Sequence, residues 1–268
     1  MKVVVVGARG FVGRQLVPAL AGRGHEVLSA SRAPHRAERV FPMERWVSTR
    51  EHTDADVVVF ATRASWPVEG ARGVRVVDAR ATPVLEPGVT TLRVGPVIGE
   101  GADAWTGLRD LAMRAPLVLR PPWFSRPIQP LWAGDLVAAL VHAIETPGEG
   151  VYDLPGPEVL PTAALLDRIA SARRMRPRTL TLPVDAPTTA VLWLRMFTRI
   201  HGERAEQLVD LLTHAEPLAE PGYWALLEHE RAPVTDAVRR TLRYEKKPAR
   251  IPERFLESLV RRAAGAGM

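Results

Sequence analysis

The sequence predicts an α/β fold, in which a doubly wound parallel sheet is joined to a smaller, mostly helical C-terminal substrate lobe. The first observation is an unbroken β-branched run at Val3–Val6, which is typical of a central parallel strand covered on both faces. The second is a helical spacing of apolar residues across residues 11–20. The third is a glycine at every third position across residues 7–13, between the strand and the helix.

Each of these glycines has a physical task in the turn. Gly7 permits a tight turn after the strand, Gly10 leaves room for phosphate oxygens, and Gly13 lets the helix lie close to the strand. The helix N-terminus supplies free amides and a partial positive charge. A second strand at 25–31 completes the context that this motif requires. We therefore expect a Rossmann-type fold that binds a dinucleotide here, with plain tight-turn glycines as the alternative.

The end of the second strand bears on which dinucleotide binds. It reads Ser31-Arg32, where an NAD-selective site would place a carboxylate against the ribose 2′-hydroxyl. Arg32, with Arg9 from the glycine loop, offers a guanidinium to a 2′-phosphate, so NADP is favoured over NAD. The alternative is that both are ordinary surface arginines. The expected cofactor-binding residues are Gly7, Arg9, Gly10, Phe11, Val12, Gly13, Ser31, Arg32, Ala61 and Thr62.

The rest of the chain continues the α/β alternation and then becomes helical. Short apolar runs predict strands at 56–61, 74–78, 89–94 and 151–154, and amphipathic spacing predicts helices at 102–114, 133–145 and 162–172. Residues 186–260 are expected to be largely helical, with breaks at prolines. We place an NAD(P)-binding domain at residues 1–150, with a pocket-lining, proline-rich insertion at about 116–130. A helical lobe packed on this domain follows at 151–268.

Residues 188–212 are apolar around most of a helical circumference. This pattern predicts a helix that lies either under the cleft or in a homodimer interface. A membrane-surface helix would show a cleaner division between apolar and basic faces, so we expect no membrane partner.

Composition limits the remaining classes of function. The 268 residues contain no cysteine, which excludes disulfides, thiolate metal sites and a cysteine nucleophile. The histidines show no metal-ligand spacing with carboxylates, so we expect no metal. The formal charge of +6 is diluted by interspersed glutamates, and we expect no nucleic-acid partner. Because the N-terminus is already the first strand, a cytoplasmic protein is expected.

Four segments follow one another in a recognisable order: 7–13, 92–99, 129–136 and 152–160. In that order they resemble the extended short-chain dehydrogenase/reductase superfamily, which includes the NAD-dependent epimerases and dehydratases. The helical C-terminal region looks most like the atypical branch of NmrA-like proteins and the related accessory subunit of respiratory complex I. The resemblance implies a nucleotide stretched across the sheet and a small substrate lobe, without naming a substrate.

One departure from that superfamily affects the chemistry. Its reductases use a Tyr-x-x-x-Lys pair, in which the lysine lowers the tyrosine pKa so that the tyrosine can protonate a carbonyl oxygen. The chain has three tyrosines and three lysines, and none forms this pair. The stretch where the pair should lie, residues 79–88, is too short for the catalytic helix.

Asp78 is the candidate catalytic residue, because it stands at the carboxyl end of a central strand. If apolar surroundings raise its pKa, Asp78 can act as a general acid or base; if Arg80 or Arg63 pairs with it, it stays ionised and only orients. The sequence does not decide between these alternatives, nor between them and a structural ion pair.

The substrate pocket is expected to be lined by Arg63, Arg80, Trp123, Arg126 and Gln129. Aromatic walls with an arginine and an amide suit a planar or apolar substrate with an anionic or carbonyl group. The alternative is a proline-rich loop that packs its aromatic side chains onto the sheet. Asp135 is expected to cap the helix that it begins.

These observations lead to one main hypothesis. The chain is expected to be an NADP-binding, reductase-like enzyme with a non-standard proton donor, acting on a small aromatic or polyketide-like substrate. Two alternatives remain open: a non-redox cyclase, isomerase or dehydratase on the same fold, and a non-catalytic protein that senses NADP or assists assembly.

Overall fold

The computed structural model describes residues 1–31, 45–48, 54–62, 70–82 and 84–245. The chain forms two compact units that interleave in sequence. The first comprises residues 1–95, 131–157 and 216–232, and the second comprises 96–130, 158–215 and the chain from 233 onward. The boundary expected at residue 150 lies within a segment of the first unit, and the division into a binding domain and a substrate lobe stays a prediction.

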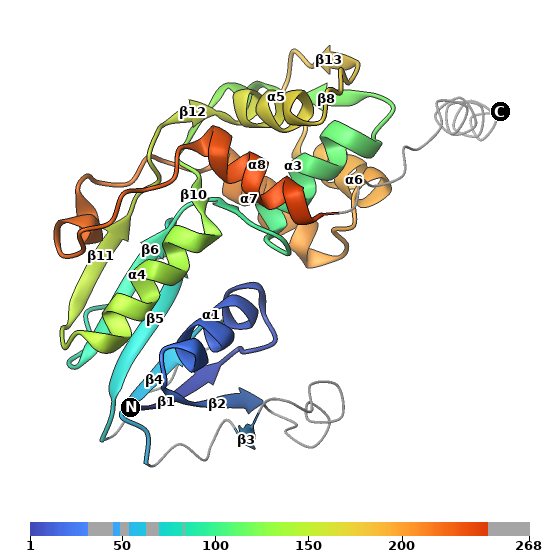
Figure 1. Ribbon diagram of the computed structural model, residues 1–268. Coiled ribbons are helices and arrows are strands. Elements are labelled where there is room, and N and C mark those ends of the chain that lie inside the picture. The colour runs from blue at the N-terminus through green and yellow to red at the C-terminus, as the bar shows by residue number, and fades with distance from the viewer. Residues whose placement is uncertain (32–44, 49–53, 63–69, 83, 246–268) are drawn as a thin grey trace. The chain divides into compact units, whose positions relative to one another are not determined.

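The first unit is built on a parallel seven-stranded sheet with the strand order β11-β6-β5-β4-β1-β2-β3 (Figure 1). The strands are β1 (Lys2–Val6), β2 (Glu26–Ser31), β3 (Trp46–Ser48), β4 (Val57–Phe60), β5 (Arg72–Asp78), β6 (Val89–Val94) and β11 (Gly150–Leu154). All four residues of β4 and the last four of β1 are buried, because these two strands lie at the centre of the sheet. The order reverses between β1 and β4, which confirms the predicted doubly wound α/β fold.

Two helices of the first unit, α1 (Phe11–Gly22) and α4 (Ala133–Glu145), pack against each other over the sheet (Figure 1). Leu16 and Leu20 of α1 and Leu140 of α4 are inaccessible to solvent, so the apolar face of each helix meets the core.

A later segment, residues 216–232 with the short helix η2 (Gly222–Ala225), also belongs to the first unit. Tyr223 is 3% exposed, and its hydroxyl lies 3.0 Å from Nδ1 of His142 in α4. Its ring also contacts the ring of Tyr152 in β11 edge to face, with 5.4 Å between the centroids. Burial, with a smaller contribution from Tyr152, raises the pKa of Tyr223 to about 12.

This shift predicts an alkaline loss of stability. Below the unfolded-state pKa of about 10 the phenol is neutral in both states, and above it the unfolded state gains stability by ionising while folded Tyr223 stays protonated. Between pH 9 and 11 we therefore expect the wild type to lose about 1 kcal/mol more of its free energy of unfolding than Tyr223→Phe loses, as measured by urea unfolding. Equal losses in both proteins would contradict this assignment.

The second unit is mainly helical. Its helices are α3 (Asp103–Arg114), α5 (Thr162–Ala172), α6 (Pro187–Phe197), α7 (Glu203–Thr213) and α8 (Val234–Tyr244), with the short helix η1 (Pro122–Ser125). Its short strands are β7 (Val97–Ile98), β8 (Val118–Arg120), β9 (Pro127–Ile128), β12 (Leu160–Pro161) and β13 (Thr179–Thr181). Strand β8 pairs with β13 and strand β9 with β12.

Helix α3 is the centre of the second unit and contacts α5, α6 and α7. At Gly107 an added Cβ would come within 2.5 Å of Leu208 in α7, so the glycine allows the two helices to approach closely. The helix expected over residues 188–212 is in fact two helices. The chain leaves α6 at Thr198, whose hydroxyl accepts the amide N–H of Ile200, and turns at Gly202 with φ of 60°.

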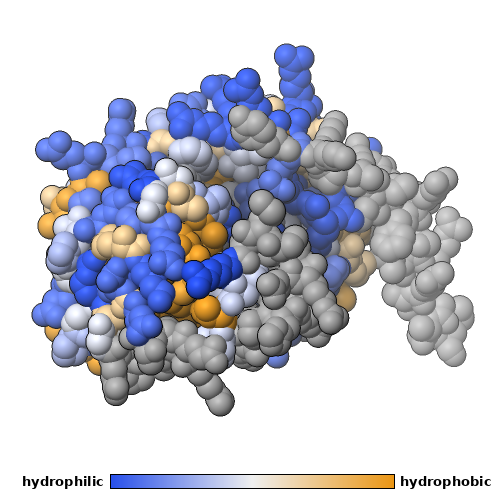
Figure 2. Space-filling model, turned by 60° about the horizontal axis from the view of Figure 1, so that its bottom comes forward, coloured by the Kyte–Doolittle hydropathy of each residue, from blue (hydrophilic) through white to orange (hydrophobic). Residues whose placement is uncertain are grey.

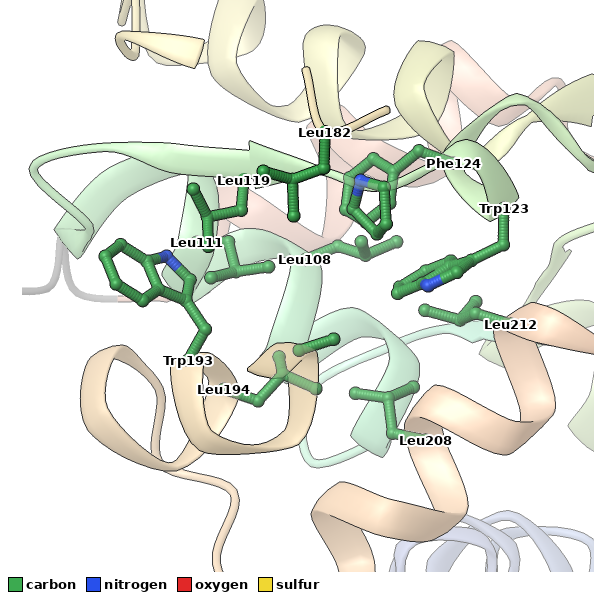
Figure 3. Close-up of a pocket in the computed structure, with 12 residues that line it drawn as sticks. Leu108, Leu111, Leu119, Trp123, Phe124, Leu182, Trp193, Leu194, Leu208 and Leu212 are labelled. Atoms are coloured by element: carbon green, nitrogen blue, oxygen red, sulfur yellow. The ribbon is translucent and has the colours of Figure 1, made fainter. Parts of the chain in front are cut away.

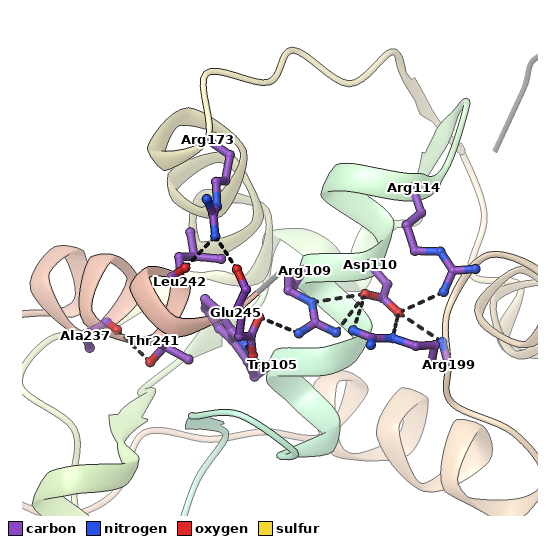
Figure 4. A network of polar contacts seen from close by, with 10 residues as sticks. All are labelled: Trp105, Arg109, Asp110, Arg114, Arg173, Arg199, Ala237, Thr241, Leu242 and Glu245. Carbon is purple, nitrogen blue, oxygen red and sulfur yellow. Dashed lines mark hydrogen bonds and ion pairs between the residues drawn. The ribbon is translucent and has the colours of Figure 1, made fainter. Parts of the chain in front are cut away.

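Charged side chains are also buried in the second unit (Figure 4). Asp110 of α3 is inaccessible to solvent and accepts hydrogen bonds from Arg109 and Arg199, with Nε–O distances of 3.0 Å to each. Arg109 also binds Glu245, which in turn accepts the indole N–H of Trp105 at 2.8 Å. Burial raises the pKa of the Asp110 carboxyl, and the charges of Arg109 and Arg114 oppose that shift.

Hydrophilic residues dominate the face drawn in Figure 2, with a hydrophobic area near its middle and smaller ones at its edges. Within the described residues, every helix is too short or too polar to cross a membrane.

Candidate functional site

The turn between β1 and α1 lies at the point where the strand order of the sheet reverses. In open α/β sheets the carboxyl ends of the strands leave a crevice at this point, because connections on either side of it run to opposite faces. The carboxyl ends of β1, β2 and β4 lie next to one another here, with Val6 in register with Ala30 and Phe60. The sequence motif therefore lies where this architecture can hold a ligand.

Gly7 is required by the geometry of the turn. Its φ is +84°, a conformation that favours glycine, and a Cβ at this position would lie 2.8 Å from the carbonyl oxygen of Ala61. The turn closes through a 2.8 Å hydrogen bond from the Gly10 amide to the Gly7 carbonyl. Ala61 is held beside it, because its amide donates to Val6 at 2.9 Å.

The N-terminus of α1 is open to an anion. Gly10 is its N-cap, so it offers no side chain to the first amides of the helix, and the first turn contains no acidic residue. Phe11, Val12 and Gly13 contribute these amides. Gly13 also brings the helix against the strand, since an added Cβ would lie 2.4 Å from Ala8 Cα. The amides and the helix dipole suit a phosphate group.

The other predicted cofactor residues fall in different parts of the chain. Ala61 and Thr62 follow β4 at the same edge of the sheet, and Ser31 is the last residue of β2 beside β1. Arg9 is exposed in the glycine turn. Arg32 and Arg63 lie outside the described residues.

Asp78 ends β5 at the carboxyl edge of the sheet and forms an ion pair with Arg80. Arg80 Nε lies 2.8 Å from Oδ1 and Nη2 lies 2.9 Å from Oδ2, and the Arg80 amide also donates to Oδ1 at 2.9 Å. Both side chains are about one quarter exposed. The pairing with Arg80 that the sequence allowed is therefore present, and the role of Asp78 stays a prediction.

That loop connects β5 to β6 without a helix in its described part, residues 79–82 and 84–88. Glu86 of the loop instead binds Arg75 of β5 through two hydrogen bonds of 2.8 and 2.9 Å. The Arg75 guanidinium holds the pKa of the Glu86 carboxyl below its usual range. Within these residues the chain has no helix that could carry a Tyr-x-x-x-Lys pair.

Three of the predicted pocket residues, Trp123, Arg126 and Gln129, lie in the second unit and differ in their burial and contacts. Trp123 is 3% exposed and lines an apolar cavity (Figure 3). Arg126 is exposed and its guanidinium donates to the carbonyl of Thr213. Gln129 is buried. Of the three, Trp123 alone is among the residues that line this cavity.

The structure also reveals a pair between a buried carboxylate, Asp135, and a partly exposed histidine, His229, that the sequence did not suggest. Asp135 does not cap α4: its carboxylate lies 2.8 Å from His229 Nε2 and accepts the amide N–H of Ala232 at 3.0 Å. His229 in turn stacks on Trp224. The capping expectation was therefore wrong, because the carboxylate binds a segment more than 90 residues later in the chain.

Comparisons with known proteins agree with this architecture. Residues 3–67 match the NAD dependent epimerase/dehydratase family. The human epimerase family protein SDR39U1 (isoform 2), solved with NADPH, superposes with a TM-score of 0.64 at 15% identity, covering 91% of this chain and all of that chain. The enzyme WbmH of Bordetella bronchiseptica, solved with NAD+, gives a TM-score of 0.55 at 16% identity, with 91% and 97% of the two chains covered.

A conserved protein of unknown function from Silicibacter pomeroyi gives a TM-score of 0.54 at 14% identity and covers 89% of this chain and 98% of that chain. No curated protein matches the sequence. The chain thus shares the fold of these solved structures, and its first strand, glycine turn and α1 match the NAD dependent epimerase/dehydratase family in sequence.

Proposed function

We propose that the chain binds NADP at the β1–α1 turn and acts as a reductase-like enzyme on a small organic substrate. The observation that carries this proposal is the open N-terminus of α1 at the point where the strand order reverses. The geometry fits a pyrophosphate, because among the described residues a Cβ added at Gly10 would meet only the carbonyl oxygens of Gly7 at 3.1 Å and Ala61 at 3.7 Å. Structural neighbours solved with NADPH or NAD+ support the same assignment.

The chain's own residues have distinct parts in this proposal. The amides of residues 11–13 bind the pyrophosphate, and Ala61 and Thr62 border the nucleotide at the end of β4. Ser31 and Arg32 favour the 2′-phosphate of NADP over the free hydroxyl of NAD. When bound, the nicotinamide supplies or accepts hydride. A substrate carbonyl then needs a proton from another donor, such as water, because Asp78 is held by Arg80.

Cofactor choice tests this proposal directly. Calorimetric titration of the full chain with NADPH and with NADH is expected to show at least about tenfold tighter binding of NADPH, since charge-assisted hydrogen bonds to a phosphate contribute about 1.5–3 kcal/mol. Arg32→Ala is expected to remove that preference while leaving NADH binding unchanged. Arg240→Ala, an arginine on α8 in the second unit, is the matched control. Absence of heat with either coenzyme would overturn the proposal.

A non-catalytic role is favoured by one observation, the loop between β5 and β6. Its described part has no helix for a Tyr-x-x-x-Lys pair, and the nearby Asp78 is already held by Arg80. A protein that reads NADP occupancy without turnover would need neither group. Consumption of NADPH with any member of a carbonyl-compound panel supports the enzyme, and tight binding without turnover supports the sensor.

A further inference from the structure

The interior of the second unit contains a narrow apolar cavity between α3, α6, α7 and η1 (Figure 3). Its walls include Leu108, Leu111, Phe124, Trp193 and Leu212. The empty space between the lining side chains is about 430 Å³ with the open mouth included, and about 20 Å³ of it admits the centre of a water-sized sphere. The cavity as it stands therefore has room for about one water molecule, and a larger guest must displace side chains at the mouth.

One polar group in the wall lacks a hydrogen-bond partner. Trp123 is 3% exposed, and its indole Nε1–H has no acceptor among the described residues. In contrast, Trp105 donates to Glu245 at 2.8 Å, Trp193 to the carbonyl of Leu117 at 3.1 Å, and Trp224 to the carbonyl of Pro155 at 2.8 Å. A buried donor without a partner costs about 1–3 kcal/mol, so an acceptor brought in by a guest would be stabilised there.

One side of the cavity is formed by the chain that joins β13 to α6 and by α6 itself. Leu182 and Ala190 line the cavity from these two elements. Close to them in sequence, Leu180, Val184 and Leu192 are 50%, 63% and 57% exposed, beside the exposed polar residues Thr181 and Asp185. Apolar side chains thus lie both in the cavity wall and on the surface beside it.

We propose that this cavity binds the slender apolar part of a small molecule whose single hydrogen-bond acceptor meets Trp123 Nε1–H. The ligand class is an alkyl or aryl compound with one carbonyl or ether oxygen. An apolar wall binds the hydrocarbon, and the unpaired indole N–H selects a guest with one acceptor over a pure hydrocarbon. This site lies wholly in the second unit and goes beyond the nucleotide site, because it does not require a bound coenzyme.

The test uses a series of straight-chain 2-alkanones, from 2-pentanone to 2-nonanone, titrated into the full chain. Each added methylene is expected to tighten binding by about fourfold until the cavity is filled, since burying one methylene contributes about 0.8 kcal/mol. Trp123→Phe, which keeps an aromatic ring but removes the N–H, is expected to weaken binding by about two- to tenfold.

Ala190→Phe places a ring in the cavity and is expected to abolish alkanone binding. Ala164→Phe is the matched control, because Ala164 is also a half-buried helical alanine but does not line the cavity. NADPH affinity is expected to stay unchanged in all three variants, so that the nucleotide proposal and this one can fail separately. Circular dichroism checks that each variant is folded.

Two results would overturn the proposal. The first is that the wild type binds no alkanone, in which case the unpaired indole serves only a trapped water. The second is that affinity is independent of chain length and equal in the wild type and Ala190→Phe. The chain-length series needs no variant, so it decides the matter even if a substitution unfolds the protein.

Discussion

Replacing Asp110 by alanine is expected to lower the free energy of unfolding by about 3–5 kcal/mol. The carboxylate is inaccessible to solvent and holds Arg109, which is itself 4% exposed. Its loss leaves Arg109 with Glu245 as its carboxylate partner among the described residues and frees the backbone amide of Arg199 inside the unit. Removing one partner of a buried pair costs more than the lost attraction, because Nε and Nη2 of Arg109 and the Arg199 amide then lack an acceptor. Urea unfolding followed by circular dichroism measures the change.

Asp103→Ala is the matched control for this substitution, because Asp103 lies on the same helix and also pairs with an arginine. That pair is exposed, with side-chain exposures of 36% for Asp103 and 59% for Arg204. Its removal is expected to cost about 1 kcal/mol or less, since solvent screens the interaction. Similar losses in the two variants would mean that burial of the Asp110 network contributes nothing to stability.

Gly10→Ala is expected to weaken NADPH binding by at least about 100-fold while changing stability by about 1 kcal/mol or less. The backbone of Gly10 has φ of −72° and ψ of 175°, which any residue adopts, and its new Cβ would lie 3.1 Å from the Gly7 carbonyl. The fold can therefore accept the methyl group. A phosphate bound to the first amides of α1 would collide with that methyl group. The loss of two charge-assisted hydrogen bonds to the phosphate accounts for the expected decrease in NADPH affinity.

Gly22→Ala controls for the effect of alanine on the same helix. An added Cβ at Gly22 meets nothing within 4 Å, and alanine has the higher helix propensity. We expect unchanged NADPH affinity and a stability gain of up to about 1 kcal/mol. If Gly10→Ala binds NADPH as tightly as Gly22→Ala, the phosphate does not lie at this turn.

The part of the molecule that could be predicted from sequence is the part determined by local patterns. The β-branched run of β1, the glycines of the turn and the apolar spacing of α1 all lie within 22 residues, and each reports on its own backbone. Strands β4, β5, β6 and β11 are short apolar runs between polar residues, so their positions were predicted closely as well, whereas β3 and the two- and three-residue strands of the second unit were not predicted. The glycine turn thus gave both the fold class and the candidate nucleotide site.

The features that escaped prediction depend on partners distant in the chain. Asp110 reads as a polar position on an amphipathic helix, and the Arg199 that binds it comes from the turn between α6 and α7. Asp135 reads as a helix cap, yet it binds His229. The break between α6 and α7 was hidden by a continuous apolar pattern that packs equally well on two shorter helices. The apolar periodicity of a helix indicates which of its faces is buried. It does not indicate which residues pack against that face.

The order in which the chain is synthesised affects how the first unit folds. The segment that supplies Tyr223 and His229 to α4 and β11 is separated in sequence from β11, the last strand of the sheet, by residues 158–215 of the second unit. During synthesis the nascent sheet must wait for residues 216–232 to emerge, so its last tertiary contacts form after the helices of residues 158–215 have left the exit tunnel. Late formation of these non-local contacts slows folding. The first unit therefore completes its fold only after residues 158–215 of the second unit have been synthesised.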